Sequence, residues 1–116
     1  MSLMLTDYIT ALTDAPSTLT FDDTLSVIDA HYDFTPTAFK NGGVENAANT
    51  NNGSCKVFSF ATLHGLTQAQ TLAMFAQHYQ NVLDNPKGDA HANIRAFMAG
   101  GLDGVVFDGV ALVSKP

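Results

Sequence analysis

A polar, asparagine-rich segment that runs directly into an apolar one is the feature that most constrains how this chain folds. Residues 46–55 read NAANTNNGSC, and the apolar run VFSFA occupies residues 57–61. This junction is typical of a loop that enters a buried helix, with Asn52 or Ser54 as the helix N-cap and Gly65 just past the helix end. Apolar residues lie on nearly all sides of that helix, so we expect it at the centre of the fold.

Helical periodicity predicts four more helices, over residues 5–12, 21–32, 68–83 and 90–98. Thr20 with Asp23 predicts a capping box at the second helix of the chain. Thr67 and Asp89 are the expected N-caps of the last two helices.

After residue 101 the apolar period changes from helical to alternating. Val105–Phe107 and Val110–Leu112 flank Asp108-Gly109, which predicts a two-residue hairpin. The expected fold is therefore α+β, mainly α: a compact bundle of about five helices with a C-terminal β-hairpin. The expected core residues are Phe58, Phe60, Leu63, Leu72, Phe75, Tyr79, Ile94 and Phe97.

The composition excludes several classes of protein. The chain has 116 residues, 46% of them hydrophobic and 14% charged, which indicates one folded domain over residues 4–116. Residues 1–3 look like a vector-derived leader before a native start at Met4. The net charge of −6, with five scattered basic residues, argues against binding to nucleic acid or to an anionic membrane surface.

Targeting signals are absent from the sequence. No apolar run approaches the roughly 20 residues that span a bilayer, and the N-terminus lacks the basic start of a secretory signal. The single cysteine, Cys55, cannot form an internal disulfide, which is typical of a reducing compartment. We therefore expect a cytoplasmic protein, and nothing in the sequence calls for a cofactor.

Several short sequence motifs resemble those of the HopJ (HopPmaJ-like) type III effector family. The resemblance extends over about nine-tenths of the chain. The motifs are Ile28–Tyr32, Phe34–Gly42, Asn51–Phe58, Leu63-His64, Asn93–Met98 and Gly104–Phe107. The resemblance implies a bacterial protein, either resident in the cytoplasm or exported by a type III secretion system. It implies no substrate, partner or catalytic residue, so the site has to come from the residues themselves.

The leading hypothesis is a binding module whose recognition surface is the polar loop over residues 41–55. Side-chain amides that converge with helix-end N–H groups suit a small polar ligand or a partner protein. Arg95, on the expected inner edge of the last helix, is a candidate for holding a carboxylate, with pairing to an aspartate as the alternative. The candidate ligand-binding residues are Asn41, Asn46, Asn49, Asn51, Asn52, Ser54 and Arg95.

The competing hypothesis is a thiol-dependent hydrolase or transferase. Cys55 would be the nucleophile, because a helix N-terminus lowers the pKa of a thiol, and His31 or His64 would be its base. The alternative for Cys55 is a small buried packing residue. The four histidines, His31, His64, His78 and His91, lack the short spacings of a zinc site, so we expect no metal. A third hypothesis is a homodimer that pairs through the edge of the terminal ribbon.

Overall fold

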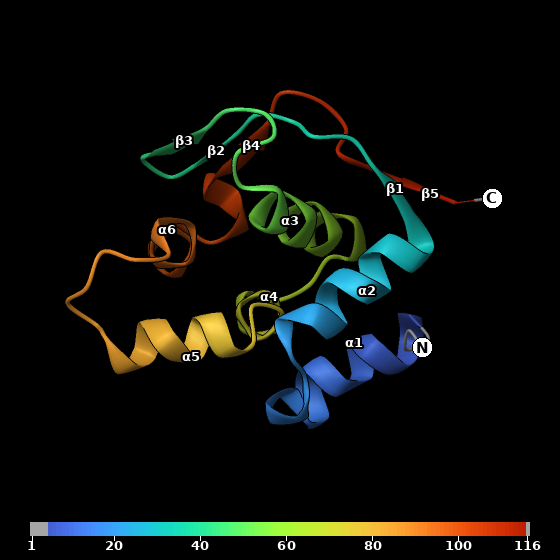
Figure 1. The fold of residues 1–116 in the computed structure, drawn as a ribbon, viewed down its shortest axis with the longest axis horizontal. Coiled ribbons are helices and arrows are strands. Elements are labelled where there is room, and N and C mark those ends of the chain that lie inside the picture. Colours follow the sequence, from blue (N-terminus) through green and yellow to red (C-terminus); the bar gives the residue numbers. More distant parts are fainter. Residues whose placement is uncertain (1–4, 116) are drawn as a thin grey trace.

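The computed structural model describes residues 5–115, which form six α-helices, two 3-10 helices and five strands (Figure 1). The α-helices are α1 (Leu5–Asp14), α2 (Phe21–His31), α3 (Asn52–His64), α4 (Gln68–Ala73), α5 (Gln77–Asp84) and α6 (Ala92–Gly100). The strands are β1 (Tyr32–Phe34), β2 (Phe39–Asn41), β3 (Val44–Asn46), β4 (Val105–Phe107) and β5 (Leu112–Ser114), and the 3-10 helices are η1 (Pro16–Thr18) and η2 (Leu102–Gly104). The α+β, mainly helical class is confirmed, whereas the expected leader at residues 1–3 lies outside the described residues.

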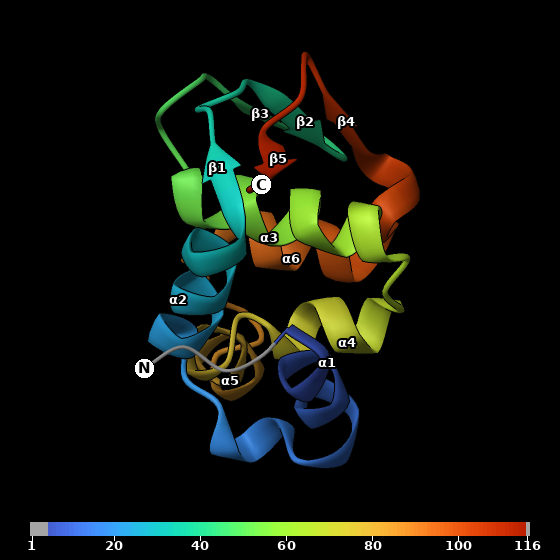
Figure 2. The same cartoon turned by 90° about the vertical axis from the view of Figure 1, so that its right-hand side faces the viewer.

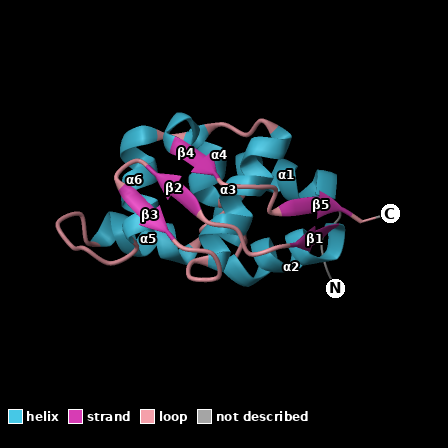
Figure 3. Cartoon of the chain, turned by 90° about the horizontal axis from the view of Figure 1, so that it is seen from above, coloured by secondary structure: helices cyan, strands magenta, loops and turns pink. Residues whose placement is uncertain are grey.

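Helix α3 lies between a layer of strands and a layer of helices. The strands run along one side of α3 and α6, and α1, α2, α4 and α5 cover the other side (Figures 1 and 2). Seen from above, the sheet β3-β2-β4 and the sheet β1-β5 lie next to one another over the helices (Figure 3). Residues Val57, Phe58, Phe60 and Ala61 of α3 are fully buried, which confirms the prediction of a central helix.

The predicted core is confirmed for six of its eight residues, namely Phe58, Phe60, Leu72, Phe75, Ile94 and Phe97. Leu63 is instead 56% exposed, because only one side of the last turn of α3 remains covered. Tyr79 is partly buried. Tyr8 was not among the expected core residues, but it is fully buried. Its hydroxyl lies 2.6 Å from the hydroxyl of Thr24.

The predicted C-terminal hairpin is wrong: the first strand forms as predicted, but the second begins at Leu112, where the predicted strand was expected to end. Strand β4 pairs antiparallel with β2, with Phe107 opposite Phe39, and β5 pairs antiparallel with β1, with Leu112 opposite Phe34. A two-stranded hairpin alone is marginally stable in water. Splitting the two strands between two sheets lets Leu112 be buried to 3% exposure against the helices.

The single helix predicted over residues 68–83 is two helices, α4 and α5. The hydroxyl of Thr24 donates to the backbone carbonyl of Met74 at 2.7 Å, and Met74 itself is fully buried. Ala76 then takes a φ of 50° with a ψ of −119°, a sparsely populated conformation that costs a non-glycine residue about 1–3 kcal/mol. Tertiary packing of Met74 therefore interrupts a sequence whose apolar period continues without a break.

Two of the predicted N-caps are confirmed and two are wrong. Thr20 and Thr67 both form capping boxes. Helix α6 begins at Ala92 rather than after Asp89, because the guanidinium group of Arg95 holds the preceding loop in a non-helical shape through its carbonyl oxygens. The N-cap of α3 is Asn51 rather than Asn52 or Ser54, and its side chain makes no capping hydrogen bond.

Candidate functional site

A cavity of about 530 Å³ lies where the first turns of α3 and α6 meet the end of β3. Its wall includes residues 50–54, residues 91–94 and the side chain of His78 from the first turn of α5. The aromatic rings of Phe21 and Phe75 close its apolar side. The cavity therefore brings part of the predicted polar loop together with two elements that are distant in sequence.

Three buried asparagine side chains tie the wall of the cavity together. Asn46 and Asn93 exchange two hydrogen bonds through their side-chain amides, at 3.1 and 2.9 Å. The amide of Asn41 donates to the backbone carbonyl of Asn93 at 2.7 Å. These three residues are at most 6% exposed, so they join β2 and β3 to the first turn of α6 as a buried amide cluster.

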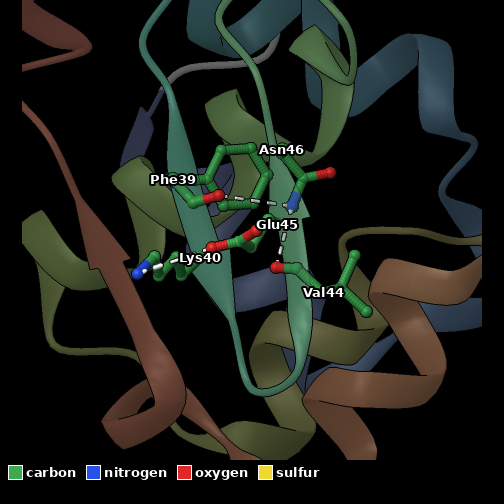
Figure 4. A network of polar contacts seen from close by, with 5 residues as sticks. All are labelled: Phe39, Lys40, Val44, Glu45 and Asn46. Carbon is green, nitrogen blue, oxygen red and sulfur yellow. Dashed lines mark hydrogen bonds and ion pairs between the residues drawn. The ribbon is translucent and has the colours of Figure 1, made fainter.

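The amide of Asn46 also binds its own sheet. Its Nδ2 atom points toward the backbone carbonyls of Phe39, at 3.5 Å, and Val44, at 3.4 Å (Figure 4). An ion pair between Lys40 and Glu45, 3.5 Å apart, joins the outer faces of the same two strands (Figure 4). Asn41 and Asn46 are thus strand residues with buried amides that bind protein, and the free polar loop is shorter than the predicted 41–55 segment.

The remaining amides of the segment lie at or near the cavity. Asn51 lines it and donates to Oδ1 of Asn46 at 2.5 Å, which connects the loop to the buried amide cluster. Asn52 and Ser54 line it as well, and the amide of Asn52 donates to Asn49 at 2.8 Å. Asn49 is exposed with a left-handed φ of 67°, and it is a turn residue outside the cavity wall.

Six backbone N–H groups on the cavity wall have no acceptor among residues 5–115. They belong to residues 52–54 at the start of α3 and residues 92–94 at the start of α6. The first helical hydrogen bonds are donated only by the next residues, Cys55 and Arg95. The first N–H groups of a helix carry partial positive charge and bind acceptors readily. Both helices therefore present donors to the same cavity.

Two histidines face each other at the cavity. The ring centroids of His78 and His91 are 5.1 Å apart, and His78 also packs edge-on against Phe21 at 4.8 Å. Burial lowers the pKa of His78 below its ordinary value, the neighbouring His91 lowers it further, and Asp22 opposes both effects. His91 itself is the N-cap of α6 and has a left-handed φ of 57°.

Arg95 lies behind this wall and binds backbone. Its guanidinium group donates to the carbonyl oxygens of Ala90 at 2.6 Å, Asn85 at 2.9 Å and Pro86 at 3.3 Å. These bonds hold the loop between α5 and α6, which carries His91. Arg95 therefore positions the site. The alternative expected from the sequence, pairing with an aspartate, is not found within residues 5–115, where Asp29 pairs with Lys56 at 2.9 Å.

Cys55 lies in the first turn of α3, as the sequence predicts, but its environment does not activate it. The thiol is 1% exposed and donates to the carbonyl of Thr37 at 3.5 Å. Burial raises the pKa of the Cys55 thiol above its ordinary value, and the hydrogen bond to Thr37 only partly offsets this. A buried, protonated thiol is a poor nucleophile.

Neither histidine proposed as its base is bound to Cys55 within the described part of the chain. His64 lies nine residues further along α3, about 13 Å along the helix axis at 1.5 Å per residue. Its ring is instead 2.5 Å from the Tyr32 hydroxyl, and burial lowers the pKa of His64. His31 ends α2, and its carbonyl accepts a hydrogen bond from the backbone of Lys115. The three residues of the predicted catalytic set are therefore not brought together.

Sequence reasoning missed three contributors to the cavity: Asn93, His78 and His91. The signal for Asn93 was an amide on the apolar face of the predicted last helix, next to Ile94. No comparable signal marks His78 and His91, because only the turn at Ala76 and the loop held by Arg95 bring their rings together. Among residues 5–115 no group of three or more His, Cys, Asp or Glu side chains is arranged to hold a metal ion.

Comparison with known proteins identifies a family whose model spans nearly the whole chain. The model of the HopJ type III effector protein family matches residues 5–112. The chain belongs to the HopJ family. This confirms the resemblance found in its sequence. None of the helices in the described range is long and apolar enough to cross a membrane.

A solved structure similar to this HopJ protein is the crystal structure of the unknown function protein VPA0580. The two share 44% sequence identity with a TM-score of 0.95, over 99% of this chain and 97% of that chain. Among curated proteins, no sequence matches. The comparisons therefore establish the fold and the family. They name no activity or ligand, so the function is inferred from the residues of the cavity.

Proposed function

We propose that this HopJ protein is a binding module that takes a small polar ligand in the cavity between α3, α6 and the end of β3. The observation that carries the proposal is that two helix starts, residues 52–54 and 92–94, line one cavity and that their six backbone N–H groups have no acceptor among residues 5–115. Unpaired donors at helix starts bind acceptor groups of ligands in many unrelated folds.

The size and lining of the cavity support this reading. Its volume of about 530 Å³ lies within the range of small-molecule sites, which is roughly 300–1,000 Å³. Asn51, Asn52 and Ser54 add side-chain donors and acceptors, and the rings of Phe21 and Phe75 supply an apolar wall. A few placed polar groups on a partly apolar wall are typical of ligand pockets.

The buried amide cluster supports a function that depends on fixed geometry. Asn41, Asn46 and Asn93 hold the end of β3 against the start of α6 through hydrogen bonds of 2.7–3.1 Å. Binding residues are most effective when a rigid scaffold positions them. The cluster holds both walls of the cavity in place before a ligand arrives, so binding needs little ordering of the chain.

The test is a ligand screen read by backbone amide NMR of the labelled protein. Small polar compounds from several chemical classes, including amides, sugars, carboxylates and sulfate, are titrated while the amide signals of residues 50–54 and 91–94 are followed. We expect at least one class to shift these signals selectively. The proposal fails if no class does so, or if the shifts are spread over the whole surface.

A matched pair of variants assigns the shifts to the cavity. Ala92 and Ala99 are both exposed residues of α6, but only Ala92 lines the cavity. Ala92→Trp places a large ring in the opening and is expected to abolish the selective shifts, whereas Ala99→Trp is expected to leave them unchanged. Equal binding by both variants would place the ligand elsewhere and overturn the proposal.

A further inference from the structure

The two histidines of the cavity wall form a pair whose ring nitrogens are free. His78 and His91 have ring centroids 5.1 Å apart, with the ring planes inclined at 43°. Within the described residues, no side-chain or backbone group hydrogen-bonds to either imidazole. This contrasts with His64, whose Nε2 lies 2.5 Å from the Tyr32 hydroxyl. Two imidazoles that share a cavity without partners are available to a ligand.

We propose that an anionic oxygen group of the ligand, a carboxylate or a phosphate-like oxyanion, accepts hydrogen bonds from the ring N–H groups of His78 and His91 and that protons are taken up as it binds. This inference rests on the proposed function and specifies its ligand class. Two imidazolium rings provide charged N–H donors, which form stronger hydrogen bonds than neutral donors do. The backbone N–H groups at the starts of α3 and α6 add further donors on the same wall.

The other charges around the pair decide how strongly an anion is favoured. Asp22 of α2 acts on His78 and favours its charged form. Glu45 of β3 lines the cavity and opposes an anion, although its ion pair with Lys40 at 3.5 Å reduces that effect. Arg95 of α6 adds a positive charge behind the loop that carries His91. The two rings themselves repel each other when both are protonated, and an anion between them removes that repulsion.

This arrangement fixes the direction of the pH dependence. Burial and the neighbouring His91 lower the pKa of His78 in the ligand-free protein, so that His78 is neutral at pH 7. An anion at the pair raises the pKa of His78 again. Binding therefore strengthens as the pH falls below 7 and weakens as it rises. Each linked proton changes the affinity by up to about tenfold per pH unit.

The test uses three small probes of similar size: acetate, sulfate and neutral acetamide. Acetate and sulfate keep a constant charge between about pH 6 and pH 8, so any pH dependence belongs to the protein. Imidazole signals of the labelled protein are followed by NMR at several pH values. We expect acetate, sulfate or both to shift the signals of His78 and His91, with an affinity that rises toward pH 6, and acetamide to leave them unchanged.

Which anion binds tells the two ligand sources apart. Tighter binding of acetate indicates a carboxylate ligand, and tighter binding of sulfate indicates a phosphate-like one. If acetamide binds as well as acetate with no pH dependence, the anion inference is overturned while the proposed binding function stands. If none of the three probes reaches the cavity but a sugar or amide from the wider screen does, the anion inference is likewise overturned.

Variants separate the pair from the rest of the protein. His78→Gln keeps a polar helical residue, and His91→Asn suits the left-handed φ of 57°, which asparagine tolerates. Each is expected to weaken acetate or sulfate binding about tenfold or more, the effect of one charged hydrogen bond. His31→Gln, outside the cavity, is the matched control and should bind as the wild type does. Unchanged binding by the double variant would overturn the inference.

Discussion

The starts of α2 and α4 differ from the starts of α3 and α6 in how their backbone N–H groups are used. Thr20 with Asp23, and Thr67 with Gln70, close capping boxes with hydrogen bonds of 2.9–3.2 Å. At α3 and α6 the N-cap side chains make no capping bond, and the first three residues of each helix line the cavity. The first N–H groups of α2 and α4 are thus bound by side chains of the chain itself. Those of α3 and α6 have no acceptor among residues 5–115 and are available to a ligand.

The largest effect is expected from the buried amide cluster that positions the open helix starts. Asn93→Ala removes both side-chain hydrogen bonds that Asn93 exchanges with Asn46 and the weaker acceptor of the Asn41 amide, whereas the backbone carbonyl that accepts from Asn41 remains. Leaving a buried polar group unpaired costs about 1–3 kcal/mol, so we expect unfolding to become easier by about 2 kcal/mol. Asn81→Ala, at an exposed position of α5, is the control and should change stability by less than about 0.5 kcal/mol. Chemical denaturation measures both.

The second prediction tests the comparison directly. Thr67→Ala removes the cap of α4 and is expected to cost about 1 kcal/mol in unfolding free energy. Ser54→Ala, in the first turn of α3, removes a hydroxyl that caps nothing and should cost less than about 0.5 kcal/mol. If the two variants lost equal stability by thermal denaturation, α3 would have to be counted among the capped helices.

The third prediction supplies an anion from within the chain. Ser54 lines the cavity in the first turn of α3, so Ser54→Asp places a carboxylate among the unpaired N–H groups. We expect a gain of about 0.5 kcal/mol from the favourable interaction with the helix dipole. The same variant should lose binding of acetate and sulfate, whereas Ser54→Asn, similar in size and neutral, should keep it. A destabilised Ser54→Asp protein would contradict the positive character of this wall.

The smallest effect is a pH dependence of stability. Burial lowers the pKa of His64 and of His78 in the folded protein below the ordinary value of 6.5. The unfolded chain therefore takes up protons first as the pH falls, so stability is full above pH 6.5 and decreases below it. His64→Gln and His78→Gln should each remove part of this decrease in a series of melting curves. Sulfate should offset only the part that belongs to His78.

The capped starts of α2 and α4 could be predicted because their capping residues are close together in the sequence. The capping boxes at Thr20 and Thr67 depend on residues three positions apart, and such signals are present in the sequence itself. The central position of α3 follows from apolar residues on all its sides, and the structure confirms it. Alternation also predicted the strand at residues 105–107, but it placed the second strand at 110–112 instead of 112–114, and it did not predict the partners of either strand.

The arrangement of the cavity wall at the starts of α3 and α6 could not be predicted, because the residues that contact one another there are distant in sequence. Asn46 and Asn93 lie 47 positions apart, and nothing local indicates that their amides exchange hydrogen bonds. The break at Ala76, which helps to bring His78 to the cavity, depends on the hydroxyl of Thr24 at the carbonyl of Met74. Of the candidate ligand-binding residues in the predicted polar loop, Asn51, Asn52 and Ser54 line the cavity, and neither of the cavity histidines was among the candidates.

The division of the last two strands between two sheets has a consequence for how the molecule assembles. Strand β5 pairs with β1, so that Ser114 lies opposite Tyr32, and β4 completes the sheet that β2 and β3 begin. Both strands follow α6 in the sequence, far from the strands they pair with. Because pairings between distant parts of a chain form slowly, we expect both sheets to close late in folding.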